Sequence, residues 1–292
     1  MRQCAVAATF DIDTILCTRF EIEHGHDVDF RFQVRWSSQN QFSDQTKTTI
    51  LQTINMSPSN LSRAITQEQW KQVVGLSRAF PEMARMWTKR EGLFDGKTNA
   101  HVLPLHEALV GGAPLKVIRE LIHAYPNALS KQESSYKRLP LHIACRKHAD
   151  TEIIEYLLER HHAAALEPDS LDRLPIHYAL TNGAEPEVID IFMKHEPACA
   201  RGRDYKGWNP VFVALNVGAS EEVVKKLLDA NPESTLMRTK RGFSIRSVIP
   251  KDSTLREELL ELVTEEKLKV EEAVHLPSMK RNPLRASRMV MV

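Results

Sequence analysis

The sequence has little of what a disulfide-stabilised, membrane-spanning or nucleic-acid-binding protein needs. Aromatic residues make up 7 %, glycines number 11, and 39 basic residues balance 38 acidic ones. Balanced charge gives no reason to expect nucleic acid or a membrane surface as a partner. No segment of the sequence reaches 18 consecutive apolar residues, so we expect no membrane span. The four cysteines show neither metal nor disulfide spacing: Cys4, Cys17, Cys145 and Cys199. We therefore expect an intracellular protein, cytoplasmic and/or nuclear.

Catalytic signatures are also missing. The sequence contains no glycine-rich phosphate loop, no nucleophile elbow and no paired-carboxylate motif. Cys145 is a possible nucleophile, but no base partner can be assigned to it. His24 and His26 flank a glycine in a way that a metal site tolerates, but a solvated loop is the preferred interpretation. We predict a protein that is not an enzyme, with no cofactor and no metal, and keep a cryptic enzyme as a remote alternative.

What the sequence does have is a repeated phrase. LPLHEAL, LPLHIAC, LPIHYAL and NPVFVAL begin at residues separated by 36, 35 and 35 positions: Leu103, Leu139, Leu174 and Asn209. A second marker keeps the same register nine residues into each unit: Gly112, His148, Gly183 and Gly218. Fixed-period similarity of this kind predicts a repeat architecture.

Each unit reads as two short helices and a loop. A proline fits the first turn of the first helix, where its missing N–H costs nothing: Pro104, Pro140, Pro175 and Pro210. The marker glycine is a helix C-cap signal, and His148 must take that role in the second unit at some strain. The second helix carries apolar residues at helical period, as in Ile153, Ile154, Leu157 and Leu158.

No single unit can bury its own apolar face, so neighbouring units must stack into a solenoid. The Pro-Leu-His-x-Ala core, followed by Gly and a Val/Ile-Leu-Leu helix, resembles the ankyrin repeat over roughly residues 99–250. The units are 35–36 residues long instead of the family's 33, and leucine replaces the usual capping threonine in three of them. The resemblance implies an all-α, helix-turn-helix solenoid with loop fingers.

The flanks complete the expected organisation. We expect a low-order arm at 1–65, although its segment FEIEHGHDVDFRFQVRW alternates like a strand. A degenerate capping repeat should follow at 66–102, with an enlarged finger at 88–102, and then four repeats at 103–243. A degenerate cap with a charged helix is expected at 244–275, followed by a basic flexible tail at 276–292.

The repeated histidines, His106, His142 and His177, are expected to be structural. Stacking separates equivalent positions by about 10 Å. Zinc needs its ligand atoms at about 2.1 Å from one centre, which that spacing forbids. Phe212 takes the same place in the fourth unit, so no shared chemistry depends on a histidine there. The resemblance implies that these side chains hydrogen-bond between adjacent loops.

The resemblance also implies where a partner binds, which is the concave face. On the first helices the candidate positions are Glu107, Ile143, Arg146, Lys147, Tyr178, Thr181, Asn182, Val213 and Asn216. On the fingers they are Asp172, Arg173, Tyr205, Lys206, Trp208, Lys240 and Arg241. We expect the aromatic residues among them to be exposed, since Tyr, Trp and Arg dominate interface energetics.

We therefore predict a monomeric protein–protein interaction module, with another protein of unidentified kind as its partner. One alternative is an adaptor whose basic C-terminal tail carries the binding. That tail ends in Val290, Met291 and Val292, a pattern suited to strand addition in a PDZ-like groove.

Overall fold

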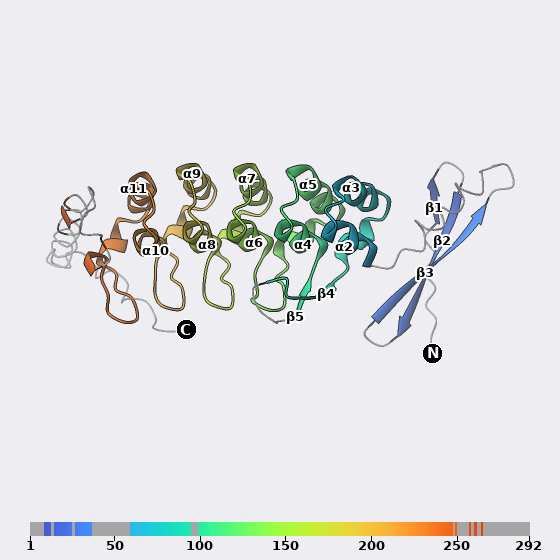
Figure 1. Ribbon diagram of the computed structural model, residues 1–292, viewed down its shortest axis with the longest axis horizontal. Helices are drawn as coiled ribbons and strands as arrows, with labels where there is room; N and C mark the ends of the chain where they lie inside the picture. Colours follow the sequence, from blue (N-terminus) through green and yellow to red (C-terminus); the bar gives the residue numbers. More distant parts are fainter. Residues whose placement is uncertain are drawn as a thin grey trace, which may run out of the picture. The chain divides into compact units, whose positions relative to one another are not determined.

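The computed structural model describes residues 9–12, 15–24, 27–36, 59–94 and 99–247, together with a few single positions beyond (Figure 1). The chain divides into two compact units, 1–60 and 61–292.

The N-terminal unit contains a three-stranded antiparallel sheet in the order β1-β2-β3. Its strands are β1 (Thr9–Ile12), β2 (Ile15–His24) and β3 (Asp27–Trp36). Tight connections place Ile12 opposite Ile15 and His24 opposite Asp27. The expectation of a low-order arm is wrong for this stretch. The alternating pattern predicted strands, but β1 went unrecognised, and a third strand is what makes such a sheet sustainable.

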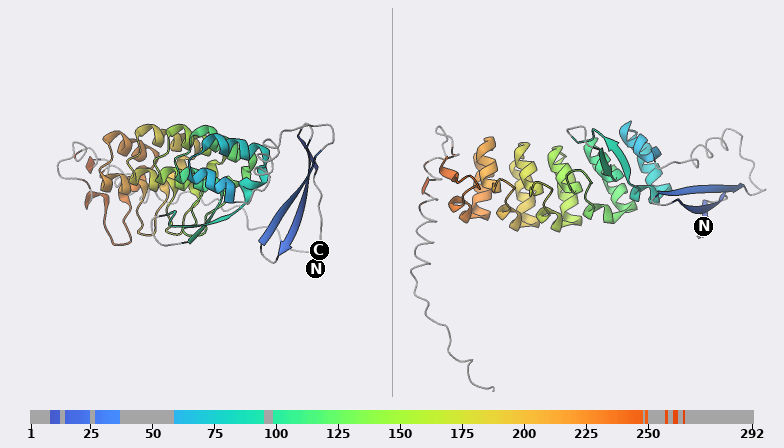
Figure 2. Two further views of the ribbon diagram at one scale, coloured as in Figure 1. Left: turned by 45° about the vertical axis from the view of Figure 1, so that its right-hand side comes forward. Right: turned by 90° about the horizontal axis from the view of Figure 1, so that it is seen from below.

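The second unit is a helical repeat in which helices form two rows, shown in Figures 1 and 2. The first helices are α2 (Ser59–Thr66), α4 (Pro104–Val110), α6 (Pro140–Arg146), α8 (Pro175–Thr181) and α10 (Pro210–Val217). The second helices are α3 (Trp70–Ala79), α5 (Leu115–Ala124), α7 (Thr151–Arg160), α9 (Pro186–His195) and α11 (Glu221–Ala230). Successive helices of each row pack against one another from α4 to α10 and from α3 to α11.

A short 3-10 turn follows the second helix of each unit, and the sequence did not predict it. The turns are η1 (Pro81–Arg85), η2 (Pro126–Ser130), η3 (His162–Leu166), η4 (Pro197–Arg201) and η5 (Pro232–Leu236). Four of them begin with a proline: Pro81, Pro126, Pro197 and Pro232. Each turn buries two small or apolar residues, such as Ala164 and Ala165 or Cys199 and Ala200. The connection between successive units is therefore partly core.

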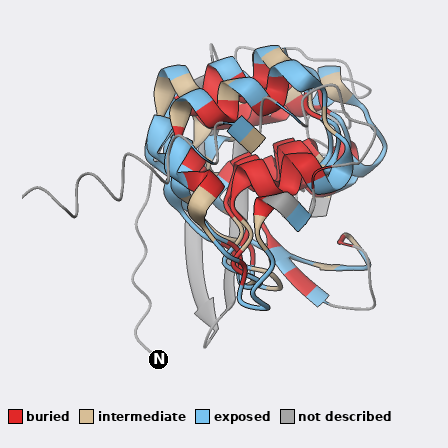
Figure 3. Cartoon of the chain, turned by 90° about the vertical axis from the view of Figure 1, so that its left-hand side faces the viewer, coloured by how far each residue is buried: buried red, intermediate tan, exposed pale blue. Residues whose placement is uncertain are grey.

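Burial follows the two rows, as Figure 3 shows. The first helices are buried almost all round, whereas each second helix buries one face and exposes the other. The apolar residues predicted at helical period are the buried ones, for example Ile153, Ile154, Leu157 and Leu158, each at most 4 % exposed. This is the burial expected for an amphipathic helix whose apolar stripe faces the core.

The local start and stop signals are confirmed. Each of the four predicted prolines is the first residue of its first helix. Gly112, Gly183 and Gly218 have φ of 68°, 76° and 73°, and His148 has φ of 53°. A residue with a Cβ is strained in that left-handed region. The strain predicted for His148 is therefore present.

Two boundaries differ from the prediction. The second unit begins at Leu61, not after residue 65, because α2 buries Leu61, Ala64 and Ile65 and supplies a first helix to the N-terminal capping repeat. The enlarged finger is an antiparallel hairpin of β4 (Thr88–Glu91) and β5 (Asn99–Val102). The protein is thus mostly helical and not all-α. At the C-terminal end η6 (Ile245–Ser247) is described, but most of the predicted charged helix and the whole tail lie outside the described residues.

Candidate protein-interaction surface

The loops between each 3-10 turn and the next first helix form a row of fingers, which Figure 1 shows extending from the row of first helices. We define the fingers as residues 131–138, 167–173, 202–208 and 237–243. Each is closed by a buried polar side chain that accepts backbone N–H hydrogen bonds from its own turn: Glu133, Asp169, Asp204 and Thr239. In the third finger, Asp204 Oδ1 accepts from the N–H groups of Lys206 (2.9 Å) and Trp208 (2.8 Å).

One residue in each finger adopts a left-handed conformation at the same place in the repeat: Lys137, Asp172, Gly207 and Gly242. Glycine occupies this position without steric cost in the last two fingers. Lys137 (φ 58°) and Asp172 (φ 54°) occupy it under strain. The turn is therefore set by the polar anchor and the backbone, and its exposed side chains are free to vary.

Backbone hydrogen bonds join each finger to its neighbour. Ser170 N–H donates to the carbonyl of Tyr136 (2.8 Å), and Lys240 N–H donates to the carbonyl of Lys206 (2.9 Å). Equivalent bonds join the hairpin to the first finger and the second finger to the third. The fingers therefore form one continuous, cross-bonded row.

The repeated histidines make the loop-to-loop contacts that the sequence analysis expected. Leu139 N–H donates to His142 Nδ1 (3.2 Å), and His142 Nε2 donates to the carbonyl of Arg173 in the next finger (3.0 Å). His106 and His177 repeat the pattern. Since a carbonyl only accepts and an N–H only donates, each ring must be neutral with its proton on Nε2. Burial lowers the pKa of His106 and His142 to about 4 and lowers that of His177 as well.

The fourth unit has no histidine at this position, and a different side chain bonds the backbone at the start of its first helix. Asn209 precedes the helix, and its Oδ1 accepts the N–H of Phe212 (2.8 Å). Asn209 therefore caps the N-terminus of α10 with its side chain. Phe212 is buried where the histidines lie in the other units and packs on Trp208, with ring centroids 5.1 Å apart.

A model of the family described as ankyrin repeats (three copies) matches residues 105–195 and 141–237. Residues 105–237 are ankyrin repeats. The resemblance drawn from the Pro-Leu-His-x-Ala motif is confirmed. Ankyrin repeats generally mediate protein–protein interaction and are typically non-catalytic. No curated protein matches the chain.

Four of the positions expected to face a partner are buried in the ankyrin repeats: Glu107, Ile143, Tyr178 and Val213. Tyr178, expected to be exposed, is 2 % exposed. They occupy one equivalent position on successive first helices, and that position is buried in every one of these units. The expectation that these side chains contact a partner is therefore wrong.

Glu107 and Tyr178 have structural partners instead. Glu107 accepts hydrogen bonds from the hydroxyls of Ser62 and Thr88, both at 2.6 Å, and so ties α4 to α2 and β4. The Tyr178 hydroxyl donates to Asp169 Oδ2 (2.5 Å) and accepts from Arg138 (3.2 Å). Desolvation and the bond to Asp169 raise the pKa of Tyr178.

Arg138 makes the largest number of contacts between neighbouring fingers among the residues described so far. Its guanidinium lies 4.2 Å from the ring centroid of Tyr136, 5.1 Å from that of Tyr178 and 5.7 Å from that of Phe94. Its Nε lies 3.9 Å from Asp169 Oδ2. These partners come from the hairpin, two fingers and α8, so Arg138 joins successive units.

The other predicted positions are accessible. Nine are exposed: Lys147, Asp172, Thr181, Asn182, Tyr205, Lys206, Asn216, Lys240 and Arg241. Three are half-buried: Arg146, Arg173 and Trp208. Lys206 Nζ lies 5.4 Å from the ring centroid of Tyr205 and 5.2 Å from that of Trp208. The Arg173 guanidinium lies 5.9 Å from the ring centroid of Tyr205, which belongs to the next finger.

The titratable groups inside the ankyrin repeats do not converge on one cleft. Each lowered histidine pKa belongs to a ring hydrogen-bonded within its own pair of fingers. Burial raises the pKa of the Cys145 thiol, and raises that of Cys199 to about 12. Such thiols are inert as nucleophiles. Within the described part of the chain, no group of three His, Cys, Asp or Glu residues is placed to hold a metal ion. The candidate metal-binding pair of His24 and His26 lies partly outside the described residues, because residue 26 is not described.

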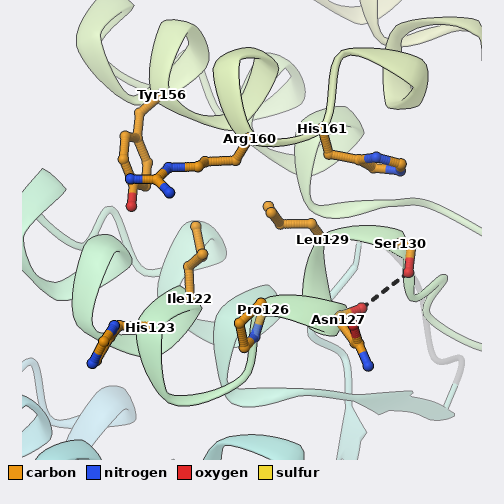
Figure 4. A pocket seen from close by; sticks show the side chains of 9 residues that line it. All are labelled: Ile122, His123, Pro126, Asn127, Leu129, Ser130, Tyr156, Arg160 and His161. Carbon is orange, nitrogen blue, oxygen red and sulfur yellow. Dashed lines mark hydrogen bonds between the residues drawn. The ribbon is translucent and has the colours of Figure 1, made fainter.

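A pocket of about 460 Å³ lies between α5 with η2 and the C-terminal half of α7 (Figure 4). Its basic lining residues are His123, Arg160 and His161, and Tyr156 lies within cation–π distance of Arg160 (5.2 Å). All three basic residues belong to the last turn or the C-cap of a helix. Basic side chains are favourable beside the exposed carbonyls at that end of the helix dipole, so the pocket requires no ligand to explain them.

None of the helices in the described segments combines the length and apolar character that crossing a membrane requires.

Proposed function

We propose that the chain binds a protein partner through the fingers and the adjoining exposed positions of the first helices. The observation that carries the proposal is the group formed by Arg173, Tyr205, Lys206 and Trp208. Two accessible aromatic rings and two cations lie together on neighbouring fingers whose backbones are fixed by Asp169 and Asp204. Tyr, Trp and Arg are the residue types that dominate interface energetics, and a rigid support lowers the entropic cost of binding.

The finger group is better suited to binding than the second helices. The exposed faces of the second helices are covered by charged side chains that pair with one another, such as Lys194 with Glu155 (2.9 Å). Buried thiols at Cys145 and Cys199 are consistent with a reducing, intracellular compartment, which belongs to the same proposal. We further propose that the chain acts as a monomer.

The test is affinity capture from native lysate with quantitative mass spectrometry. The finger variant is Tyr205→Ala/Lys206→Ala, and its matched control is Glu187→Ala/Lys194→Ala on the outer face of α9. Circular dichroism must first show that all proteins are equally folded. The proposal expects the finger variant alone to lose specific partners.

The tail hypothesis is tested beside it by a chain truncated after Glu272. If only the truncated chain loses its partners, binding belongs to the tail and the finger surface is not the working site. If no variant loses a partner, neither surface carries binding.

A further inference from the structure

Charge is unevenly distributed over a chain that is nearly neutral as a whole. Leaving out the buried anchors and Arg138, the four fingers carry eight accessible cations: Lys131, Lys137, Arg173, Arg203, Lys206, Arg238, Lys240 and Arg241. They carry two accessible acids, Glu167 and Asp172. On the first helices, Arg146 and Lys147 add positive charge on α6 and its C-cap, and Glu107 is buried. The finger row therefore presents a net positive surface.

The finger cations differ from those of the second helices in their partners. Lys194, Lys225 and Lys226 each pair with a carboxylate within 3.4 Å, on their own or the neighbouring second helix. In the part of the chain that the structure describes, Lys206, Lys240 and Arg241 pair with no carboxylate. Lys206 and Lys240 are also adjacent, since their fingers are joined by a backbone hydrogen bond. Unneutralised neighbouring cations repel one another, and an acidic partner relieves that repulsion.

The aromatic residues argue against nucleic acid as that partner. Single-stranded nucleic acid binds to open aromatic faces on which bases stack. Here Tyr205 lies within cation–π distance of both Arg173 and Lys206, and Trp208 packs against Phe212 and lies near Lys206. The rings hold the cations in place more than they offer stacking platforms. The cation–π contacts also fix where the positive charges stand.

We propose that the finger row binds an extended polypeptide segment rich in Asp and Glu. This rests on the proposed function and names the class of partner. The segment lies across successive fingers so that its carboxylates meet Arg173, Lys206, Lys240 and Arg241. Electrostatic complementarity of this kind supplies specificity and association rate, and salt weakens it.

The direct test uses the full chain and a fluorescent peptide of five Glu-Gly-Ser repeats, with binding followed by anisotropy. The same peptide with Gln in place of Glu is the uncharged control. The finger variant is Lys206→Glu/Lys240→Glu. The matched control is Lys71→Glu/Lys116→Glu, which makes the same charge change at exposed lysines of α3 and α5. Salt is varied from about 0.1 M to about 1 M, where the Debye length falls from about 10 Å to about 3 Å.

The expected result is that the Glu peptide binds at about 0.1 M salt and at least about tenfold more weakly at 1 M. The finger variant should lose at least about tenfold in affinity and the control variant less than about twofold. Equal binding of the Gln peptide, equal loss in the control variant, or no binding up to about 1 mM peptide would overturn the proposal. A single-stranded oligonucleotide that binds more tightly than the Glu peptide, with a steep salt dependence, would assign the surface to nucleic acid instead.

The lysate experiment separates this proposal from the one it rests on. If the Tyr205→Ala/Lys206→Ala variant loses partners that survive a wash at about 1 M salt, the finger surface binds protein but not through charge. In that case the interaction function stands and the acidic segment is refuted. If the variant loses no partner, the interaction function itself fails.

Discussion

The second helices and the fingers of this protein are stabilised by different forces. The second helices bury an apolar stripe and leave paired charges outside, such as Lys226 with Asp190 at 2.8 Å. The fingers bury few large apolar side chains. They are fixed by buried polar groups, among them Asp169, Asp204 and His142, whose bonding capacity is used mainly by backbone atoms. Burial of an apolar stripe is non-directional and tolerates substitution by other apolar side chains. A buried polar network, by contrast, is disrupted when one member is removed.

The largest expected effect of breaking that network is at Arg138. Arg138→Ala removes one partner of the buried ion pair with Asp169 and the cation–π contacts to Tyr136 and Tyr178. Because it leaves a buried carboxylate with fewer partners, we expect the free energy of unfolding to fall by about 3 to 5 kcal/mol. Urea denaturation at pH 7 measures it.

Lys131→Ala is the control, because Lys131 is an exposed cation of the same finger. Its unfolding free energy should change by less than about 0.5 kcal/mol. A loss below about 1 kcal/mol for Arg138→Ala would show that the contacts around Arg138 do not hold the fingers.

The next effect is a pH dependence carried by the buried histidines. Burial lowers the pKa of His142 to about 4, whereas an unfolded histidine titrates at about 6.5. Between these values the unfolded chain binds more protons than the folded one, so stability is full above pH 6.5 and is lost as the pH falls toward 4. At pH 4.5 one such histidine costs about 2.5 kcal/mol.

The fourth unit, which has no histidine at this position, shows how the titrating His142 can be replaced. Leu139→Asn/His142→Phe copies Asn209 and Phe212 into the second unit. Urea denaturation at pH 7 and pH 4.5 should show that the variant loses about 2.5 kcal/mol less than the wild type on acidification. Equal losses in the wild type and the double variant would contradict the assignment of the proton to His142.

The contrast between second helices and fingers also explains which features could be predicted from the sequence. Period, proline positions and the apolar stripe of the second helices are local patterns, so the paired helices of the four repeats and even the strain at His148 were predicted correctly. Burial under the fingers is not local. Tyr178 and Arg138 look like exposed binding residues in sequence, but they meet across a separation of 40 positions.

The missed features were of two kinds. The in-register series Glu133, Asp169, Asp204 and Thr239 was visible in the sequence, but its chemistry varies and a repeat search for identical residues passes over it. Helix α2 lies before the recognisable phase of the repeat, and only packing of Leu61 and Ile65 reveals its place.

A smaller effect, of opposite sign, is expected at the left-handed position of the fingers. Lys137→Gly removes a strained Cβ at φ 58° and should raise the unfolding free energy by about 0.5 to 1 kcal/mol. Gly207→Ala should do the reverse, because φ there is 78° and an added Cβ would lie 3.0 Å from Lys240 N. Thermal unfolding of both variants measures this, with Lys137→Ala as the control that removes the side chain but keeps the strain. A gain in Lys137→Ala as large as in Lys137→Gly would assign the effect to the charge of the lysine and not to its backbone.

The smallest effect is expected where charges pair on the second helices. Lys194 lies 2.9 Å from Glu155 on the neighbouring second helix, and their side chains are 62 % and 36 % exposed. Exposed pairs contribute little because water screens them and ordering two long side chains costs entropy. Lys194→Gln should therefore change the unfolding free energy by less than about 0.5 kcal/mol, and high salt should erase even that change. Urea denaturation of Lys194→Gln, Glu155→Gln and the double variant gives the coupling energy of the pair. A coupling above about 1 kcal/mol would mean that the second helices, like the fingers, depend on specific polar contacts between successive units.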